Sequence, residues 1–322
     1  MPHLVWPEWL PQPLVNALLA SVTRYSEKKR AFLSRFTYDE EFSVTEINQA
    51  PKVIWLKRRF SDAMTIDILE DNWFSMIGAM LHKMLEDHAP SNHVVEERQW
   101  VILDIDGKRV LFHGEPDVYD PKKVEVDYKF VSASALMYDH QGYIDQLRAN
   151  AFLLAARGKP VERIMNAYCM RYIDRQKKKQ DPDYPQTNVV IKEYPLLPVA
   201  ETEKVITDKI RRILAAKPLH WRKLPDCTPD ERWEHGTWGV YTKYKDKKRS
   251  DEWSTKAKGR FQKEKDARAF AGEHQEETKV EYKKGYPTLC DYCNVIQWCQ
   301  QRQKELKEEA NRKSEHTVRD DD

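Results

Sequence analysis

Residues 114–130 restrict the possible folds of this chain more than any other stretch. Two runs of alternating apolar and polar residues, one ending at 117 and one covering 124–130, flank the sequence Asp-Pro-Lys-Lys at 120–123. Aspartate and proline are typical turn residues, and alternation with a period of two is typical of strands. The stretch therefore predicts two adjacent antiparallel strands joined by a tight turn.

Polar side chains are expected to gather on one face of the second strand. Side chains alternate along a strand, so Asp127 and Lys129 point to one face while Val126 and Tyr128 point to the other. Asp117, at the end of the first run, can come round to the same polar face. Two carboxylates beside one ammonium form a hard oxygen site for Mg²⁺ or Mn²⁺, with a positive charge left to hold a water or a phosphate.

An acidic residue two places before a lysine is also common on solvated surfaces. The same spacing recurs at Glu281 and Lys283 and at Glu305 and Lys307. The triplet at 127–129 is therefore informative only in combination with other residues of the chain.

The composition is that of a globular protein with a real core. The chain has 322 residues, of which 40% are hydrophobic and 33% are charged. No apolar run approaches a membrane span, and residues 1–7 lack the basic start and apolar core of a signal peptide. We therefore expect a cytoplasmic protein with no membrane partner.

The net charge of the chain is +2, so any contact with nucleic acid has to rest on local basic patches. Residues 171–179 and 243–249 are either such patches or solvated loops.

A helix with a histidine on it is expected before the strands. Apolar residues recur at helical spacing from 68 to 85, and His82 lies among them. The histidine can reach a metal held on the neighbouring sheet, and a half-buried helix histidine is the alternative. Gly78, one turn earlier, is expected to allow a close approach to this helix.

The remaining elements alternate between strands and helices. Residues 99–103 and 108–112 flank Asp-Ile-Asp-Gly, which predicts a hairpin that continues into 114–117 as one meandering sheet. A helix at 142–157 carries Gln146 on its polar side, and the glycine at 158 ends it. The elements expected after it are a strand at 164–172, a strand at 189–194 and a helix at 199–216. This order predicts an α/β sandwich.

In the order of these residues along the sequence, the chain resembles the PD-(D/E)XK nuclease superfamily. The resemblance is in particular to its RecB-like exonuclease branch, which includes phage-encoded members. That branch carries, in order, Gly-x-x-x-His, Gly-x-x-Asp, Asp-x-Lys and Gln-x-x-x-Tyr. The matching residues are Gly78 and His82, Gly114 and Asp117, Asp127 and Lys129, and Gln146, with Asn150 in the place of the tyrosine. The resemblance covers residues 40–175 and a cysteine cluster at 287–300.

The resemblance implies a fold and a role for each matching residue. The fold is α/β, with a restriction-endonuclease-like core in which a mixed central sheet is flanked by helices. The implied ligands of Mg²⁺ or Mn²⁺ are His82, Asp117, Asp127 and the carbonyl oxygen of Tyr128. The implied catalytic residues are Asp117, Asp127, Lys129 and Gln146. In this scheme Lys129 orients or deprotonates the attacking water and offsets charge on the phosphate.

The expected organisation of the chain has three parts. Residues 1–220 form the nuclease core with an N-terminal helical region. Residues 221–288 form a small α/β insert rich in basic and aromatic side chains, and residues 289–322 carry the cysteine cluster and a charged tail.

The cysteine cluster implies a second cofactor. Cys290, Cys293 and Cys299 have a spacing similar to that with which related RecB-like nucleases, using one more distant cysteine, hold a [4Fe–4S] cluster. Cys227 is expected to be the fourth ligand because it lies in a loop, whereas Cys169 lies in an apolar strand where a core thiol is the default. A structural Zn²⁺ is the alternative.

The functional hypothesis is a metal-dependent DNA exonuclease that acts in DNA recombination, repair or replication. Its partners are linear, end-containing DNA and a recombination or replication protein, and a phage-encoded member would work in the host cytoplasm. The alternatives are a structure-specific endonuclease on the same core and a non-catalytic DNA-binding module. A channel that requires a free DNA end is expected, lined by Lys243, Lys245, Lys247 and Arg249, with Trp238 or Tyr241 stacking on unpaired bases.

Overall fold

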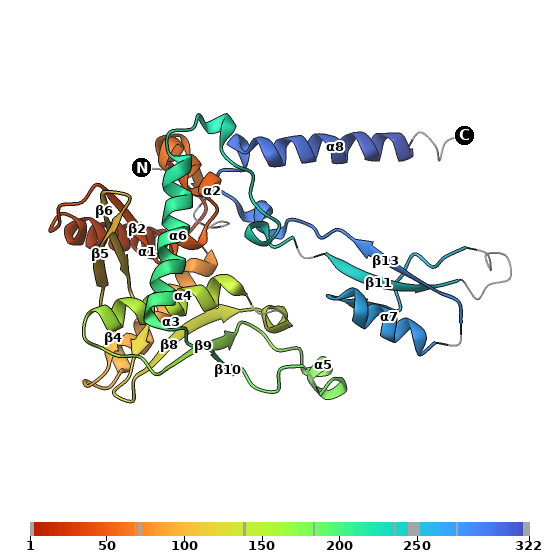
Figure 1. Ribbon diagram of the computed structural model, residues 1–322, viewed down its shortest axis with the longest axis horizontal. Coiled ribbons are helices and arrows are strands. Elements are labelled where there is room, and N and C mark those ends of the chain that lie inside the picture. The colour runs from red at the N-terminus through yellow and green to blue at the C-terminus, as the bar shows by residue number, and fades with distance from the viewer. Residues whose placement is uncertain are drawn as a thin grey trace. The chain divides into compact units, whose positions relative to one another are not determined.

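Two mixed sheets, a short parallel sheet of two strands and the helices packed on them form the first part of the computed structural model (Figure 1). The structure describes residues 3–67, 69, 73–137, 140–182, 184–234, 236–243, 252–274 and 276–317. By its internal contacts the chain divides into two units, Met1–Leu219 and His220–Asp322. The segments expected at 221–288 and 289–322 both fall in the second unit.

The elements of the first unit are as follows. Its strands are β1 (His3–Val5), β2 (Glu40–Ser43), β3 (Thr65–Asp67), β4 (Val94–Val95), β5 (Gln99–Ile105), β6 (Lys108–Gly114), β7 (Val118–Tyr119), β8 (Val124–Val131), β9 (Arg163–Met170) and β10 (Val189–Tyr194). Its helices are α1 (Gln12–Leu33), η1 (Glu46–Asn48), α2 (Pro51–Phe60), η2 (Ser61–Ala63), α3 (Trp73–His88), η3 (Ala133–Met137), α4 (Gln141–Ala156), α5 (Arg175–Gln180) and α6 (Val199–Ala216), where η marks a 3₁₀ helix.

The larger sheet of this unit is mixed and has the strand order β10-β9-β8-β7-β4. β8 runs parallel to β9 and antiparallel to β7, so the antiparallel pairing predicted around the turn at 120–123 is confirmed, although the first strand of the pair covers Val118–Tyr119 and not the run that ends at 117. Oδ1 of Asp120 accepts hydrogen bonds from the N–H groups of Lys122 and Val124 and thereby closes this turn. β10 and β4 pair antiparallel to β9 and β7 respectively.

The hairpin of β5 and β6 belongs to a separate sheet with the order β2-β6-β5. Its predicted turn is confirmed, with φ of 54° at Asp106 and 77° at Gly107. The prediction that the hairpin continues into the next strands as one meandering sheet is wrong. The chain leaves β6 at Gly114 and passes Pro116, which has no N–H to donate to a ladder, before it enters β7 in the larger sheet.

Helix α4 packs against strands of both mixed sheets, β5 and β6 of one and β8 and β9 of the other. Leu147 and Ala151 of α4 pack with Ile164 of β9 in a buried cluster. The predicted end of this helix is confirmed, because Gly158 takes a φ of 77° and donates its N–H to the carbonyl of Ala155. α6 packs on α4 and α2 (Figure 1). The architecture is therefore mixed α/β, with mixed sheets flanked by helices.

The second unit holds a three-stranded antiparallel sheet and the cysteine-bearing segment. Its elements are η4 (Trp221–Lys223), η5 (Asp230–Arg232), β11 (Thr237–Thr242), β12 (Gly259–Phe261), α7 (Glu264–Gly272), β13 (Thr278–Lys283), η6 (Thr288–Tyr292), η7 (Ile296–Trp298) and α8 (Gln300–Thr317). The sheet has the order β12-β11-β13, and α7 packs on it through Ala267 and Ala271 against Val240. A sheet with one helix packed on it agrees with the α/β character expected for residues 221–288.

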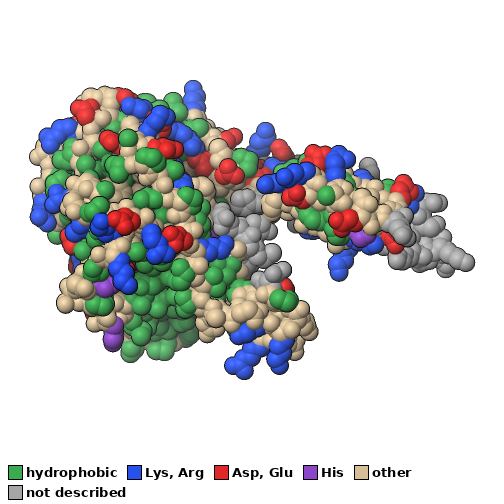
Figure 2. Space-filling view, turned by 60° about the horizontal axis from the view of Figure 1, so that its bottom comes forward, with side chains coloured by type: hydrophobic (Ala, Val, Ile, Leu, Met, Phe, Trp, Pro, Cys, Tyr) green, Lys and Arg blue, Asp and Glu red, His purple; other side chains and the backbone are tan. Residues whose placement is uncertain are grey.

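Figure 2 shows where side chains of each kind gather on one face of the molecule. Apolar side chains form a broad area on the first unit, whose exposed large hydrophobic residues include Met80, Met84, Val189 and Ile191. The basic residues of α5 are exposed as well. Among the residues that the structure describes, no helix is both long and apolar enough to span a membrane.

Candidate functional site

Three potential metal ligands from separate segments meet at one point of the first unit. Nδ1 of His82 lies 3.0 Å from Oε1 of Glu96 and 3.4 Å from Oδ1 of Asp117. One ligand atom of each residue lies within 4.8 Å of the other two, and no second group of three or more His, Cys, Asp or Glu side chains meets this condition within the described part of the chain. Carboxylate and imidazole ligands suit Mn²⁺, and the carboxylates suit Mg²⁺.

The backbone fixes both acidic members of this group. Oδ2 of Asp117 accepts a hydrogen bond of 2.6 Å from the N–H of Tyr128, so Oδ1 is the atom that faces His82. Glu96 follows β4 with a φ of 50°, and its N–H lies within hydrogen-bond distance of the carbonyls of Pro116 and Asp117, at 3.2 and 3.3 Å. A positive φ is uncommon for residues other than glycine, so these contacts hold Glu96 in a conformation that it would otherwise rarely adopt.

His82 reaches the sheet from α3. Its ring lies edge-on to the ring of Tyr128, with 6.4 Å between the ring centroids. The predicted reason for Gly78 is wrong, because a Cβ at this position would meet no atom of the described residues within 4 Å. Gly78 lines an open groove and makes no close contact with a neighbouring element of the described structure.

The charge of His82 depends on its acidic neighbours. Hydrogen bonds to Asp117 and then Glu96 raise the pKa of His82 to about 10, although burial opposes the rise. The imidazole is therefore protonated at neutral pH and pairs with both carboxylates. Because a metal needs the neutral ring, a cation that binds here displaces this proton.

Asp127, Lys129 and Gln146 form a second polar group. Nζ of Lys129 lies 2.6 Å from Oδ2 of Asp127 and donates to Oε1 of Gln146 at 3.0 Å. Nε2 of Gln146 donates to Oδ1 of Asp127 at 2.8 Å. Asp127 and Lys129 thus share one face of β8, and Gln146 of α4 closes the group. Asp127 lies outside the ligand group of His82, so its role as a ligand stays a prediction, as does that of the Tyr128 carbonyl.

The pKa values of Asp127 and Lys129 determine which of them is charged and which can donate or accept a proton. Burial raises the pKa of Asp127 to about 6, with Lys129 opposing the rise and Asp117 adding to it. Burial also disfavours the charge of Lys129, but Asp127 and Asp117 outweigh this effect and raise its pKa. Lys129 therefore stays an ammonium at neutral pH. It is suited to donating a hydrogen bond to a water or phosphate rather than to accepting a proton.

A further carboxyl group is buried on the same face of β8. Glu125 is 0% exposed, and neither of its oxygens makes a hydrogen bond of standard geometry with the described residues, although the Asn150 side chain lies close enough to interact with it. Burial and then the charge of Asp127 raise the pKa of Glu125 well above its usual value. The direction of this shift favours the protonated form of Glu125, which reduces its repulsion of Asp127.

A groove of about 800 Å³ opens beside both polar groups, between α1 and α3. His82, Glu96, Lys129 and Gln146 contribute to its polar wall. The ring of Tyr143 lies under the ammonium of Lys129, whose Nζ is 4.9 Å from the ring centroid. The volume lies within the range of small-molecule sites, so the groove has room for a nucleotide.

Asn150, in the place of the family's tyrosine, is a core residue. It is 1% exposed, and its Oδ1 lies 2.6 Å from where a Cβ on Gly114 would stand. It packs α4 onto β6, and it also lines a pocket of about 200 Å³ together with His82, Asp117 and Gln146. The aromatic ring near the site comes instead from Tyr143, three residues before Gln146 on the same helix.

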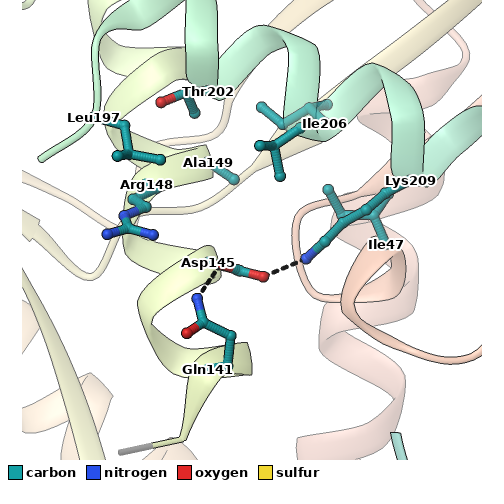
Figure 3. Close-up of a pocket in the computed structure, with 10 residues that line it drawn as sticks. Ile47, Gln141, Asp145, Arg148, Ala149, Leu197, Thr202, Ile206 and Lys209 are labelled. Atoms are coloured by element: carbon teal, nitrogen blue, oxygen red, sulfur yellow. Dashed lines mark hydrogen bonds and ion pairs between the residues drawn. The ribbon is translucent and has the colours of Figure 1, made fainter. Parts of the chain in front are cut away.

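A second pocket, of about 250 Å³, lies between α4 and α6 (Figure 3). Nζ of Lys209 lies 2.5 Å from Oδ2 of Asp145, and Gln141 donates to Oδ1 of the same carboxylate at 2.7 Å. Arg148 donates to the carbonyl of Pro195. The charged groups are occupied with one another, and none of the predicted site residues lines this pocket, so we assign it to helix packing.

The cysteine-bearing segment lies in the second unit. The N–H of Cys293 donates to the carbonyl of Cys290 at 3.2 Å, and a reciprocal pair of hydrogen bonds ties Cys227 to Gln301, from N–H to Oε1 at 2.9 Å and from Nε2 to the carbonyl at 3.1 Å. Cys227 is thus joined to the residue two places after Cys299. All five cysteines are described, and none forms a disulfide.

Cys169 lies in β9 of the first unit, where burial raises the pKa of its thiol. The other four cysteines, Cys227, Cys290, Cys293 and Cys299, all belong to the described part of the second unit, although no three of their sulfur atoms lie within 4.8 Å of one another. In number and kind they are the donor set that a [4Fe–4S] cluster or a structural Zn²⁺ needs.

The residues expected to line a DNA channel are only partly described. Lys245, Lys247 and Arg249 lie outside the described residues. Nζ of Lys243 lies 2.9 Å from Glu277. Tyr241 is 3% exposed, so the expectation that it stacks on bases is wrong.

Trp238 takes part in packing as well. Its ring lies 5.3 Å from that of Tyr282, between centroids, on the neighbouring strand β13. Its predicted stacking on bases has no support from this arrangement.

Sequence reasoning missed two residues of the site, Glu96 and Tyr143. Glu96 has no periodic signal, because its position follows from a positive φ and from contacts with residues 116–117. Tyr143 did have a signal, since residues three apart on a helix share a face and Tyr143 stands three places before Gln146.

No known family model matches the chain, and no curated protein matches it. Among solved structures, similarity is found to one titled "Crystal structure of SSO0001", with a TM-score of 0.42 and 17% sequence identity, covering 60% of this chain and 85% of that chain.

Proposed function

We propose that this chain is a Mg²⁺- or Mn²⁺-dependent deoxyribonuclease with a PD-(D/E)XK core, and that it degrades DNA from ends. The observation that carries the proposal is the meeting of two polar groups beside one groove, the group of His82, Glu96 and Asp117 and the group of Asp127, Lys129 and Gln146. Their order along the chain agrees with the RecB-like pattern, which supports the same chemistry.

The first group fits a divalent cation. His82, Glu96 and Asp117 are the residues that would hold it, and the N–H of Tyr128 keeps Asp117 turned toward them. When bound, such a cation polarises the scissile phosphate and lowers the pKa of the attacking water. Hydrolysis joins the water oxygen to phosphorus and breaks the bond to one ester oxygen, which takes up a proton.

The second group serves the charge that develops on the phosphate. The Lys129 ammonium donates hydrogen bonds toward the groove, where it stabilises a phosphate oxygen and orients the water. Gln146 holds both Asp127 and Lys129, so it keeps the ammonium in place while substrate enters. A binding-only module has no physical need for two carboxylates beside a phosphate, since they repel it.

The test of this proposal compares DNA substrates of matched sequence. Purified protein with Mg²⁺ is expected to shorten linear DNA progressively and to leave covalently closed circles intact, with activity that falls as salt rises. The Lys129→Met variant, which keeps the hydrophobic stem without the charge, is expected to bind the same DNA without hydrolysing it. Rapid cutting of closed circles would favour the endonuclease, and binding without hydrolysis by the wild-type protein would favour the non-catalytic module.

We also propose that Cys227, Cys290, Cys293 and Cys299 hold a [4Fe–4S] cluster, with structural Zn²⁺ as the alternative. The hydrogen bonds between Cys227 and Gln301 support Cys227 as the fourth ligand. A cluster there would tie the loop at 227 to the segment at 290–299 and stabilise the second unit.

The cluster is tested on protein purified without oxygen. We expect it to be brown, to contain iron and sulfide, and to lose both in Cys227→Ser but not in the matched Cys169→Ser. Colourless protein with one equivalent of zinc would favour the alternative. Loss of the cluster in Cys169→Ser alone would contradict the choice of Cys227.

In this proposal the protein works in a cytoplasm, that of the host if a phage encodes it. Its substrates are the DNA ends that arise in recombination, repair or replication, and a protein of one of these processes is the expected partner.

A further inference from the structure

Two arginines are buried within the second unit. Arg232 is 6% exposed and Arg302 is 2% exposed, and Arg302 is among the largest side chains that are almost fully buried in the described residues. Burying a charged group costs several kcal/mol unless partners compensate it. Each arginine therefore has to be explained by what surrounds it.

The terminal nitrogens of Arg232 donate hydrogen bonds to carboxylates. Its Nη1 donates to both oxygens of Glu305, at 2.7 and 2.9 Å, and its Nη2 donates to Glu234. Glu234 is itself buried and also pairs with Lys284 at 2.8 Å. The guanidinium is thus held in one orientation by a two-point contact with α8.

The terminal nitrogens of Arg302 are occupied in the same way. Its Nη1 lies 2.7 Å from Glu309 and 3.5 Å from Glu305, and its Nη2 donates to the hydroxyl of Tyr286 at 2.9 Å. Glu305 therefore contacts both arginines and joins them into one network.

One donor on each arginine is left over. The Nε atoms of Arg232 and Arg302 are buried, and neither has a hydrogen-bond partner among the described residues. A buried donor without an acceptor costs about 1–3 kcal/mol. Two such donors in one network are left without an oxygen, nitrogen or sulfur acceptor among the described residues, which indicates that a group absent from the chain itself accepts from them.

Both arginines lie beside the cysteines. η5, which ends at Arg232, packs against η6, which carries Cys290, and Arg302 follows Cys299 by three residues on the first turn of α8. Burial raises the pKa of the Cys290 thiol, and the charges of Arg232 and Arg302 oppose this rise, as expected for groups close to the sulfur.

We infer that the Nε–H groups of Arg232 and Arg302 donate hydrogen bonds to sulfur atoms of the centre that Cys227, Cys290, Cys293 and Cys299 form once the proposed metal group is bound. The inference rests on the proposed centre and assigns these two arginines a positioning role toward it. Glu305 fixes both guanidinium groups while their Nε–H groups face the sulfurs. Hydrogen bonds to the sulfurs stabilise negative charge on a cluster and so favour its reduced form.

Replacement of each arginine by lysine tests the inference, because lysine keeps the charge and removes the Nε–H. The protein is purified without oxygen, and the reduction potential and the rate of iron loss to a chelator are measured. In Arg232→Lys and Arg302→Lys we expect the ratio of reduced to oxidised cluster at a given potential to fall about tenfold, which is about 59 mV for a one-electron couple. Iron should also be lost faster.

The matched control is Arg268→Lys in α7 of the same unit. Arg268 is exposed and pairs with Glu264 one turn away, at 2.6 Å. Its replacement is expected to leave the potential and the iron content unchanged. If the lysine variants do not fold, Glu305→Gln carries the test, since it weakens the shared anchor and keeps both Nε–H groups. A lower reduction potential in Glu305→Gln, as expected for the lysine variants, supports the inference, and an unchanged potential overturns it.

The outcomes separate the inference from the proposals on which it rests. Wild-type protein with a cluster, together with lysine variants of unchanged potential and iron retention, overturns the inference and leaves the cofactor standing. If the wild-type protein contains only zinc, the rate of zinc release is compared between wild type and the lysine variants. An unchanged rate then overturns the inference, and a faster rate in the variants supports it. Wild-type protein with neither metal overturns the centre and the inference together. Hydrolysis of DNA is measured separately, because its absence bears only on the nuclease proposal.

Discussion

Oδ2 of Asp117 accepts a hydrogen bond from the backbone N–H of Tyr128 at 2.6 Å. Asp117 precedes β7, yet this bond holds its carboxylate on β8, at the residue between Asp127 and Lys129. The other carboxylate oxygen then faces His82. One backbone bond thus links the group that fits a cation to the group that fits a phosphate.

We expect Glu96→Gln to weaken Mn²⁺ binding at least tenfold, because the amide removes one of the charges of the ligand group. Glu97→Gln is the matched control, since Glu97 is the next residue, 58% exposed at its side chain and paired with Lys159 at 3.2 Å. Calorimetric titration with Mn²⁺ measures both. Equal affinities in the two variants would mean that Glu96 only balances the charge of His82.

Local features of the chain were predictable where the deciding interactions are close in sequence. The strand at 189–194 and the helix at 199–216 have the predicted bounds, because periodicity and flanking residues determine them. The turn at 120–123 and the end of α4 at Gly158 follow from the chemistry of single residues.

Features that depend on distant contacts were not predictable in the same way. Strand pairing separates β6 from β7 into two sheets, which no local pattern encodes. Glu96 enters the site only because residues 116–117 pass beside it and hold its N–H. The contact between His82 and Asp117 was expected from the resemblance rather than from the spacing of either residue.

Lys129→Met should lower kcat by about a hundredfold or more, since it removes a preorganised charged donor, and should leave Mn²⁺ affinity within about twofold. Gln146→Met should lower kcat less, because Lys129 keeps its charge and its contact with Asp127 at 2.6 Å. Gln141→Met on the exposed start of the same helix is the control. Rates on linear DNA at saturating metal measure all three. A Gln146→Met variant with unchanged kcat would remove Gln146 from the site.

The pH dependence of stability is expected to report on Glu41. Burial opposes its charge, but a hydrogen bond from His113 and the charge of Lys29 lower the pKa of Glu41 to about 2. Arg98 donates to Nδ1 of His113 at 3.0 Å, so the proton of the ring is on Nε2, which donates to Glu41 at 2.9 Å. Burial lowers the pKa of His113, which agrees with this neutral ring.

Because the pKa of Glu41 is depressed in the folded state, the Glu41 carboxylate stabilises the fold above pH 4.5. This stabilisation is lost as the pH falls toward 2. The contribution of this shift to the free energy of unfolding is at most about 3–4 kcal/mol, from about 1.4 kcal/mol per pKa unit. The free energy of unfolding of Glu41→Gln should therefore fall below that of wild type at pH 6 and approach it near pH 2. Urea titrations at both values measure the difference, and a gap that does not narrow at low pH would contradict the assignment.

The two glycines of the predicted motifs are expected to respond in opposite ways. A Cβ on Gly114 would stand 2.6 Å from Oδ1 of Asn150 and 2.7 Å from Cγ2 of Val44, so Gly114→Ala should lower the free energy of unfolding by about 1–3 kcal/mol. A Cβ on Gly78 meets no atom within 4 Å in the described part of the chain, so Gly78→Ala should raise the free energy of unfolding by about 0.5–1 kcal/mol through helix propensity. Urea unfolding midpoints measure both changes.

Gly78 also offers a test of the groove that does not involve the catalytic groups. Because it lines the groove beside His82, Gly78→Leu should fill space there and weaken DNA binding while the protein stays folded. The smaller Gly78→Ala is the matched control and should bind DNA nearly as well as wild type. Fluorescence anisotropy with labelled DNA in the presence of Ca²⁺, used in place of Mg²⁺ to slow hydrolysis, measures the affinity. If Gly78→Leu binds as tightly as Gly78→Ala, DNA does not enter the groove between α1 and α3, and its path to Lys129 runs elsewhere on the first unit.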